Sequence, residues 1–448
     1  MNDKEELFNR ARRFAERRDA RIERKLKSRK IKPLSDFQFA VQSAHGGDVL
    51  VWIEKKRLRC EVHAALCDHV FMVRRFLEEG QPAELQPEPR VKRVQTPRGW
   101  PFYKMYRRIS PIIIEYMLHD LCSQAFNEER LSGNVGQPKL LPHDVVQCVN
   151  ARRMVRGSGL EADPRVRMYH KCGWLIATEP PHEDTISKAM CQPGMYDRYV
   201  ELIELIGNLF VNSERTFLID GQFYRTPCAL FDVKVKDPND RKKTITRRAQ
   251  FIKLVVVLCA ESKAVAALSI INEEEGENSR HLELFKRTRL RFHLMELACA
   301  DTLYSDAIFR KWLDDNGIKR RIPFRDNAVP NGDGSTWDRD LDEFHEALEA
   351  DDEWWVDYLI RLTVESYFAA LMRSNGNTKK LRNKTFESLK VELSSIVLNY
   401  QLRMAFIAYL RGTIDIPWLS PRTREVMDRL RKAYLSASSA RPEVSQAS

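Results

Sequence analysis

The pattern of apolar residues between positions 215 and 324 constrains the fold of this 448-residue chain more than any other feature. Five runs there are rich in apolar and β-branched residues, as β-strands are: RTFLID (215–220), QFIKLVVVLCAES (250–262), KAVAALSII (263–271), LMELACAD (294–301) and IKRRIPF (318–324). The last two runs follow segments with helical periodicity, HLELFKRTRL (281–290) and SDAIFRKWLDDNG (305–317). The sequence therefore predicts an α/β domain with three strands in a meander, followed by helix, strand, helix and strand.

Two aspartates end the first and fourth predicted strands. The strand order is that of a ribonuclease-H-like core, a mixed sheet flanked by helices in which the first and fourth strands are parallel neighbours. Asp220 closes FLIDG and Asp301 closes ACAD, so we expect both carboxylates at one edge of the sheet, where open α/β sheets bind ligands. Either aspartate alone is also a common turn former.

A glutamate lies within YLIRLTVESYFAALMR (358–373), which otherwise reads as one buried helix because its apolar residues recur every three or four positions. An ionised carboxylate that faces a core is costly unless a cation pairs with it. Arg361, four residues before Glu365, offers one explanation as an intrahelical ion pair. The other is that Glu365 leans towards Asp220 and Asp301, where three carboxylates require cations between them, as in a site for two Mg²⁺ or Mn²⁺ ions.

At these residues the chain resembles the bacterial insertion-sequence transposases of the DDE type. Their third motif has the form Y-x2-R-x3-E-x6-K, and the chain matches its first three positions with Tyr358, Arg361 and Glu365. Met372 occupies the lysine position, and Arg373 follows it. In this family the lysine contacts DNA phosphate, so the resemblance leaves that contact without its usual residue.

A second stretch carries the same resemblance. ADTLYSDAIFRKWLDDNGIKRRIPFRDNA (300–328) is similar to the block around the family's second aspartate, including Tyr304 and Ser305, although Leu303 stands where glycine is usual. The resemblance extends from about residue 100 to residue 410.

The resemblance implies a metal-dependent DNA transposase. In such an enzyme Asp220, Asp301 and Glu365 hold two Mg²⁺ or Mn²⁺ ions that activate water, and later a DNA 3′-hydroxyl, for attack on phosphodiesters. The implied ligands of DNA phosphate are Tyr358, Arg361 and Arg373. The implied partners are the terminal inverted repeats and the target DNA, bound by a homodimer. A core aromatic role for Tyr358, and a role for Arg361 as a partner of Glu365 alone, are the alternatives.

A second candidate metal site lies in CEVHAALCDHVFMVRRFLEEG (60–80), which follows two predicted strands and leads into a predicted helix. Its four candidate Zn²⁺ ligands within ten residues are Cys60, His63, Cys67 and His69. The segment resembles a SWIM-type zinc motif, in which CxC precedes CxH, but Val62 replaces the second cysteine, so His63 would have to serve. A small cluster packed without metal is the alternative.

Charge and composition suggest where the chain works. The 74 Lys and Arg residues exceed the 63 Asp and Glu residues, and the formal net charge of +11 favours an anionic partner such as nucleic acid. Nine cysteines, most of them in apolar runs, suit a reducing cytoplasm. We find no signal peptide and no apolar run long enough to span a membrane, so we expect no membrane partner.

The predicted organisation is a basic N-terminal helix (1–35), a zinc-binding module (36–80), a proline-rich linker (81–98), a helical DNA-binding region (99–213), the ribonuclease-H-like catalytic domain (214–412), a C-terminal helix (413–434) and a disordered tail (435–448). Further helices are expected at 141–155, 182–190, 196–211 and 385–410, and an acidic loop at 326–352.

Two other functions fit the same sequence. A DNA-binding protein or repressor derived from an inactive transposase would keep the basic regions and lack catalysis. A nuclease acting on RNA:DNA hybrids would use the same core, but the helical region at 99–213, on a basic background, better suits a reader of duplex DNA.

Overall fold

The computed structural model describes residues 31–35, 38–42, 48–54, 57–60, 99–126, 140–155, 159–236, 243–325, 327–349, 353–374 and 380–439. The chain divides into two compact units, Met1–Pro97 and Arg98–Ser448, which we describe separately. No helix in these described ranges is long and apolar enough to cross a membrane.

Four strands form an antiparallel sheet in the first unit, in the order β1-β2-β3-β4. Their bounds are β1 (Ile31–Ser35), β2 (Gln38–Gln42), β3 (Asp48–Glu54) and β4 (Arg57–Cys60). The prediction of two strands around a turn is confirmed by β3 and β4. The predicted helix does not extend to residue 35, because residues 31–35 form an edge strand, where the missing N–H of Pro33 is tolerated.

The predicted zinc site cannot be placed in this sheet. Cys60 is the last residue of β4, but His63, Cys67 and His69 lie outside the described residues, as does the predicted basic helix over residues 1–30. The zinc site therefore stays a prediction.

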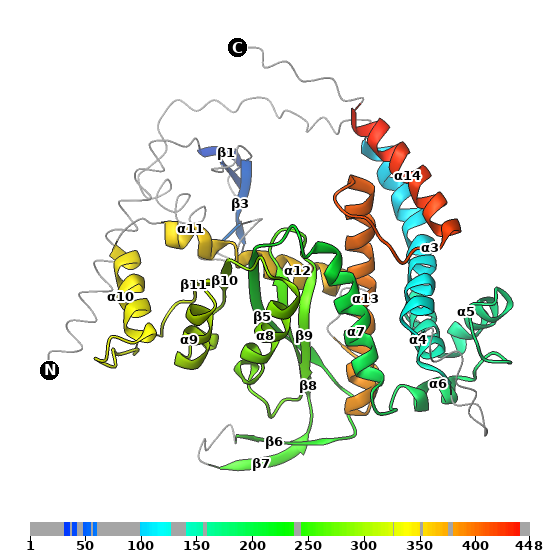
Figure 1. Ribbon diagram of the computed structural model, residues 1–448, viewed down its shortest axis with the longest axis horizontal. Helices are drawn as coiled ribbons and strands as arrows, with labels where there is room; N and C mark the ends of the chain where they lie inside the picture. The colour runs from blue at the N-terminus through cyan, green and yellow to red at the C-terminus, as the bar shows by residue number, and fades with distance from the viewer. Residues whose placement is uncertain are drawn as a thin grey trace. The chain divides into compact units, whose positions relative to one another are not determined.

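A mixed five-stranded sheet forms the centre of the second unit, in the order β11-β10-β5-β8-β9 (Figure 1). Its strands are β5 (Thr216–Arg225), β8 (Phe251–Cys259), β9 (Val265–Ile271), β10 (Leu297–Cys299) and β11 (Lys319–Arg321). β10 is parallel to β5 and β11, whereas β8 is antiparallel to β5 and β9. The predicted meander and the parallel pairing of the first and fourth strands are thus confirmed.

Helices account for most of the remaining second unit. Those that apolar periodicity predicts are α4 (Pro142–Val155), α6 (Glu183–Ala189), α7 (Met195–Gly207), α8 (His281–Arg291), α9 (Ala307–Asp315) and α13 (Phe386–Arg411). The structure also contains α3 (Gly99–Ala125), α5 (Gly159–Lys171), α10 (Thr336–Glu349), α11 (Glu353–Leu359), α12 (Leu362–Ser374) and α14 (Pro421–Ser439), with 3₁₀ turns η2 (Asn208–Phe210), η3 (Glu277–Ser279) and η4 (Thr302–Tyr304).

Helices cover both faces of the central strands. Phe217 and Ile219 of β5 belong to one buried cluster with side chains of α8 and α9. Leu218 and Tyr224 belong to the other, with side chains of α7, α12 and α13. Burial on both faces explains why these strands read as continuous apolar runs rather than as alternating ones. The helices α3 and α4 join the second cluster, so the helical region and the sheet share a core.

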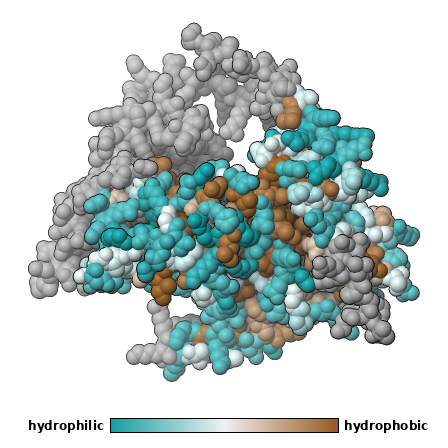
Figure 2. Space-filling model, viewed as in Figure 1, coloured by the Kyte–Doolittle hydropathy of each residue, from teal (hydrophilic) through white to brown (hydrophobic). Residues whose placement is uncertain are grey.

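The coloured part of the face in Figure 2 is largely hydrophilic, with apolar residues gathered near its centre. Leu205 of α7 and Leu290 of α8 are among the exposed large apolar residues.

The acidic segment 326–352 is not a loop throughout, because α10 occupies residues 336–349. Its Leu341 and Ala347 are buried, and its Phe344 ring lies 5.4 Å from that of Trp354. The acidic residues concealed an apolar stripe with a helical period, so the loop prediction was wrong.

Three other features of the fold differ from the prediction. The strands β6 (Asp232–Lys236) and β7 (Thr244–Arg248) form a separate two-stranded sheet that the sequence analysis did not identify. The C-terminal helix begins later than expected and continues to Ser439, because no glycine or proline interrupts residues 422–439. The single helix predicted over residues 358–373 is divided between α11 and α12.

Candidate active site

The sheet register brings Asp220 and Asp301 together. Cys299 at the end of β10 pairs with Leu218 of β5, so each aspartate lies two residues beyond this pair on adjacent parallel strands. The expectation that β5 ends at Asp220 is wrong, since β5 continues to Arg225 through its pairing with β8. Asp220 therefore lies within β5, beside the point where β10 ends. This is the edge of the sheet at which we expected both aspartates.

A tight turn between α11 and α12 positions Arg361 and Glu365. The N–H of Arg361 donates to the carbonyl of Tyr358 at 2.9 Å, and the N–H of Val364 donates to the carbonyl of Arg361 at 3.0 Å. These three-residue steps are tighter than those of an α-helix. Arg361 thus precedes α12, and Glu365 lies in the first turn of that helix, where a carboxylate is favourable at the positive end of the helix dipole.

The guanidinium of Arg361 lies among all three acidic side chains. Its nitrogens are 3.1 Å from Asp220 Oδ2, 3.8 Å from Asp301 Oδ2 and 4.0 Å from Glu365 Oε1. The exposed fractions of the three acidic side chains are 21%, 43% and 60%, in that order, against 15% for Arg361. Glu365 therefore does not face the core, and three segments distant in sequence converge on one positively charged group.

The electrostatic environment of Asp220 is unusual. Burial raises the pKa of Asp220 to about 6, opposed by the hydrogen bond from the Gly221 N–H and by Arg361, while the charges of Asp301 and Glu277 raise it further. The charge of Arg361 alone therefore does not offset the burial of Asp220 and the two neighbouring carboxylates.

A fourth acidic residue, Glu277, lies beside the site and was not identified from the sequence. A Cβ placed on Gly221 would clash with the carboxylate of Glu277, so the glycine lets Glu277 approach β5 in its present rotamer. The hydroxyl of Tyr304 is 3.4 Å from the same oxygen. Burial raises the pKa of Glu277, Lys253 lowers it and Asp301 raises it. The glycine after Asp220 was the available signal, since glycine in a strand often marks a close approach.

The two remaining candidate phosphate ligands differ in position. Tyr358 of α11 stacks with Trp354 at a ring distance of 5.6 Å, and the guanidinium of Arg361 lies 5.8 Å from the Tyr358 ring. Arg373 is exposed in the last turn of α12, eight residues beyond Glu365 and therefore about 12 Å further along the helix. The structure brings Tyr358 and Arg361 to the carboxylates and leaves Arg373 farther away.

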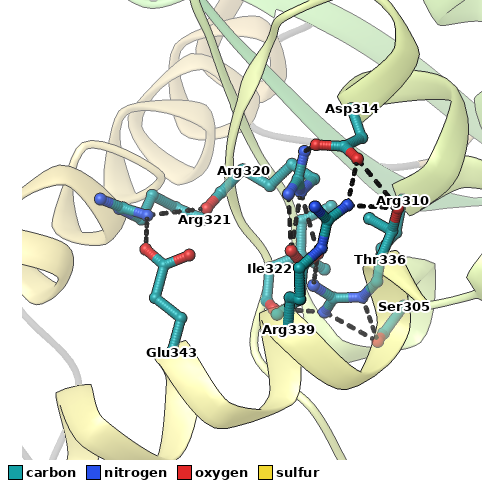
Figure 3. Close-up of polar contacts among 10 residues, drawn as sticks. Ser305, Arg310, Asp314, Arg320, Arg321, Ile322, Thr336, Arg339 and Glu343 are labelled. Atoms are coloured by element: carbon teal, nitrogen blue, oxygen red, sulfur yellow. Dashed lines mark hydrogen bonds and ion pairs between the residues drawn. The ribbon is translucent and has the colours of Figure 1, made fainter. Parts of the chain in front are cut away.

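The segment after Asp301 is held in place by a buried arginine (Figure 3). Arg310 of α9 donates to Ser305 Oγ at 3.0 Å and to Asp340 of α10 at 2.9 Å, and its guanidinium lies 3.7 Å from the Phe324 ring centroid. Asp306 accepts from the Phe309 N–H at 2.9 Å as the N-cap of α9. These contacts connect the loop that follows β10 to α9 and α10.

The donor set fits a hard divalent cation better than a soft one. Carboxylate oxygens are the ligands that Mg²⁺ and Mn²⁺ prefer. Their convergence on a volume that holds the charge of Arg361 is compatible with cations there, provided that the arginine moves aside. As the side chains stand, no group of three or more Asp, Glu, His or Cys residues in the described ranges is arranged to hold a metal ion.

In comparisons with known proteins, no family model and no curated sequence match this chain.

Proposed function

We propose that this protein is a DDE-type transposase that cleaves insertion-sequence DNA ends and joins them to a target. The observation that carries this proposal is the convergence of Asp220, Asp301 and Glu365 on one cationic position. The strand order β11-β10-β5-β8-β9, with parallel β5 and β10, supports a ribonuclease-H-like core.

Each residue has a separate task in this reaction. Asp220 and Asp301 come from adjacent strands that share a core and so form the rigid part of the site, whereas Glu365 approaches from a helix. Divalent cations, when bound, supply positive charge at the attacking and leaving oxygens of the phosphodiester. Arg361, freed from the carboxylates, is within reach to bind the phosphate of the incoming strand, and Tyr358 supports the guanidinium through its ring.

A second candidate is a DNA-binding protein without catalytic activity, and one observation favours it. Arg361 already neutralises part of the acidic cluster, as it would in a purely structural ion network. The two functions differ in whether the protein cleaves DNA, a reaction for which the transposase needs the carboxylates.

The test replaces the three acidic residues one at a time. Asp220→Asn, Asp301→Asn and Glu365→Gln should each reduce Mg²⁺-dependent cleavage of a labelled duplex end by on the order of 10²-fold or more, as loss of other preorganised electrostatic groups does. The duplex would carry the inverted repeats recovered from DNA flanking the coding sequence. Binding in a gel shift should persist, because removing negative charge does not weaken the approach of a polyanion.

The control is Asp315→Asn, since Asp315 pairs with Lys311 on the exposed side of α9. The neighbouring acids are less suitable, because Asp306 caps α9 and Asp357 pairs with Lys319 and Arg321. Normal cleavage by Glu365→Gln would remove Glu365 from the site. Absence of cleavage by the wild-type protein, with intact DNA binding, would favour the non-catalytic candidate.

A further inference from the structure

The two-stranded sheet of β6 and β7 is an insertion between two strands of the main sheet, β5 and β8. In Figure 1 it lies below β8, apart from the five-stranded sheet. The strands pair antiparallel from Asp232↔Arg248 to Lys236↔Thr244. We call these paired residues, 232–236 and 244–248, the ribbon. Because it takes no part in the main sheet or the acidic cluster, its surface calls for a separate explanation.

One face of the ribbon is anchored to the rest of the protein. Val233 packs with Ala229 and Ala249 in a small buried cluster. Arg247, opposite Val233, forms an ion pair with Glu273, which is only 4% exposed. These contacts determine which face of the ribbon is turned towards the protein.

The other face is exposed and basic. Side chains alternate along a strand, so Lys234 and Lys236 share this face with the residues opposite them, Thr246 and Thr244. All four are exposed, and neither lysine side chain has an acidic partner among the described residues. Arg248 lies on the same face and is paired with Asp232 at 3.4 Å. Lys234 and Lys236 lie two residues apart on one face and repel each other, which an anionic partner would relieve.

A neighbouring segment enlarges this positive surface. Leu230, just before the ribbon, donates its N–H to the carbonyl of Lys384 at 2.8 Å, and Leu381 donates to the carbonyl of Arg225 at 2.9 Å. These backbone bonds bring residues 380–384 beside the end of β5. The exposed basic residues gathered here are Arg225, Lys380, Arg382 and Lys384.

Apart from Asp232, which pairs with Arg248 on the outer face, the described acidic residues near this surface contact the protein itself. Glu274 accepts from the backbone N–H of Lys234, and Glu392 accepts from the backbone N–H of Arg382 at 3.0 Å. Glu273 pairs with Arg247 on the inner face. Because Asp232 and Arg248 offset each other, Lys234 and Lys236 give the described part of the outer face a positive charge.

We propose that the outer face of the ribbon binds the phosphate backbone of duplex DNA, which rests on the proposed function and adds a specific docking surface to it. A two-stranded ribbon has the size that the major groove of DNA admits. β5 advances about 17 Å between Asp220 and Arg225, five residues at roughly 3.4 Å each, and duplex DNA advances about 3.4 Å per nucleotide of a strand. A duplex lying along β5 would therefore reach Arg225, beside the ribbon, about five base pairs from the phosphate at the acidic cluster.

The experiment compares the double variant Lys234→Gln/Lys236→Gln with the full-length wild-type protein. Binding to a labelled 30-base-pair duplex would be measured by fluorescence anisotropy over a range of NaCl concentrations. Loss of two phosphate contacts should reduce the slope of log K against log salt by about 1.8 and weaken binding near 0.15 M salt by on the order of tenfold or more. Lys234→Arg/Lys236→Arg should retain the wild-type slope, because it keeps both charges.

The matched control is Lys311→Gln/Lys432→Gln, which removes the same charge from exposed positions on α9 and α14. An unchanged slope in the ribbon variant, or an equal change in the control, would overturn the inference. A ribbon-dependent loss seen with single-stranded RNA and not with duplex DNA would also overturn it.

The outcome also separates this inference from the proposed function. If the wild-type protein does not bind DNA, the proposed function fails. If it binds DNA and needs the three carboxylates for cleavage, but the ribbon variant binds with the wild-type slope, only the ribbon inference fails.

Discussion

Arg361 is the positive charge among the three carboxylates of the candidate active site. Its guanidinium lies within 4.0 Å of oxygens from Asp220, Asp301 and Glu365, so it reduces a repulsion that would otherwise destabilise the fold. The same position places it in competition with any cation that these carboxylates hold. The arginine and the metal are therefore expected to exchange places rather than to bind side by side.

We expect Arg361→Gln to lower the Tm in the absence of divalent cations, because the three carboxylates then repel one another without a cation among them. The loss should be about 1–3 kcal/mol, as for a mostly buried group that loses a charged partner. Millimolar Mg²⁺ should restore more stability to the variant than it adds to the wild-type protein, since the guanidinium no longer competes. Scanning calorimetry with MgCl₂ and with EDTA measures both effects.

The comparison variant is Arg424→Gln, because Arg424 pairs with the exposed Asp415 far from this cluster in sequence. It should respond to Mg²⁺ as the wild-type protein does. An equal response of Arg361→Gln and wild type would show that the carboxylates do not attract a divalent cation.

At the scale of elements, α9, α10 and β11 are joined by ion pairs of very different burial. Arg310 and Asp340 are 2% and 5% exposed, whereas Arg339, which pairs with Asp314, is 63% exposed (Figure 3). Removing one partner of a buried pair leaves an uncompensated charge, and removing an exposed partner does not. The two arginines therefore test how firmly α10 is held to the loop after β10.

We expect Arg310→Met to reduce the free energy of unfolding by about 1–3 kcal/mol, because Ser305 and the buried carbonyl of Ile322 lose a donor, while Asp340 keeps its ion pair with Arg320. Arg339→Gln should cost less than about 1 kcal/mol. Urea denaturation followed by tryptophan fluorescence measures both values, and Trp337 and Trp354 lie close to this network. Similar losses in the two variants would mean that burial does not decide the strength of these pairs.

At the scale of the whole molecule, the nine cysteines separate into three sets. Cys122, Cys148, Cys259 and Cys299 are buried and unbonded, and burial raises the pKa of each thiol, as for structural cysteines. Cys172, Cys191 and Cys228 are free and exposed in the second unit, and Cys60 and Cys67 belong to the predicted zinc module of the first unit. We therefore expect zinc binding by the cysteines of the first unit.

We expect the full-length protein, purified without chelators, to contain about one zinc ion per chain, because four ligands at this spacing suit a tetrahedral site. Cys67→Ala should lose the zinc, whereas Cys191→Ala, which changes an exposed free cysteine of the second unit, should keep it. Elemental analysis by mass spectrometry measures the content. Zinc well below one per chain in the wild-type protein would mean that the segment does not hold the metal.

The sequence by itself determined the sheet and the pairing of two site residues. Long apolar runs form strands wherever both faces are buried, and the order of strands and helices leaves few ways to connect them. Asp220 and Asp301 could be placed together for that reason, since parallel neighbouring strands end at the same edge. The capped helix α13 was equally predictable, because Thr385 and Gly412 mark its ends with local chemistry.

Only the tertiary structure decided how the other groups approach this edge. The break before α12 has no glycine or proline to signal it, yet it decides that Glu365 is exposed and that Arg361 lies among the carboxylates. Glu277 lies near Asp220 only because the loop after β9 returns over Gly221. The apolar side chains of α10 are buried only because aromatic rings such as that of Trp354 pack against them. Such contacts join segments distant in sequence, so local periodicity carries no information about them, and the packed chain alone determines which charges meet.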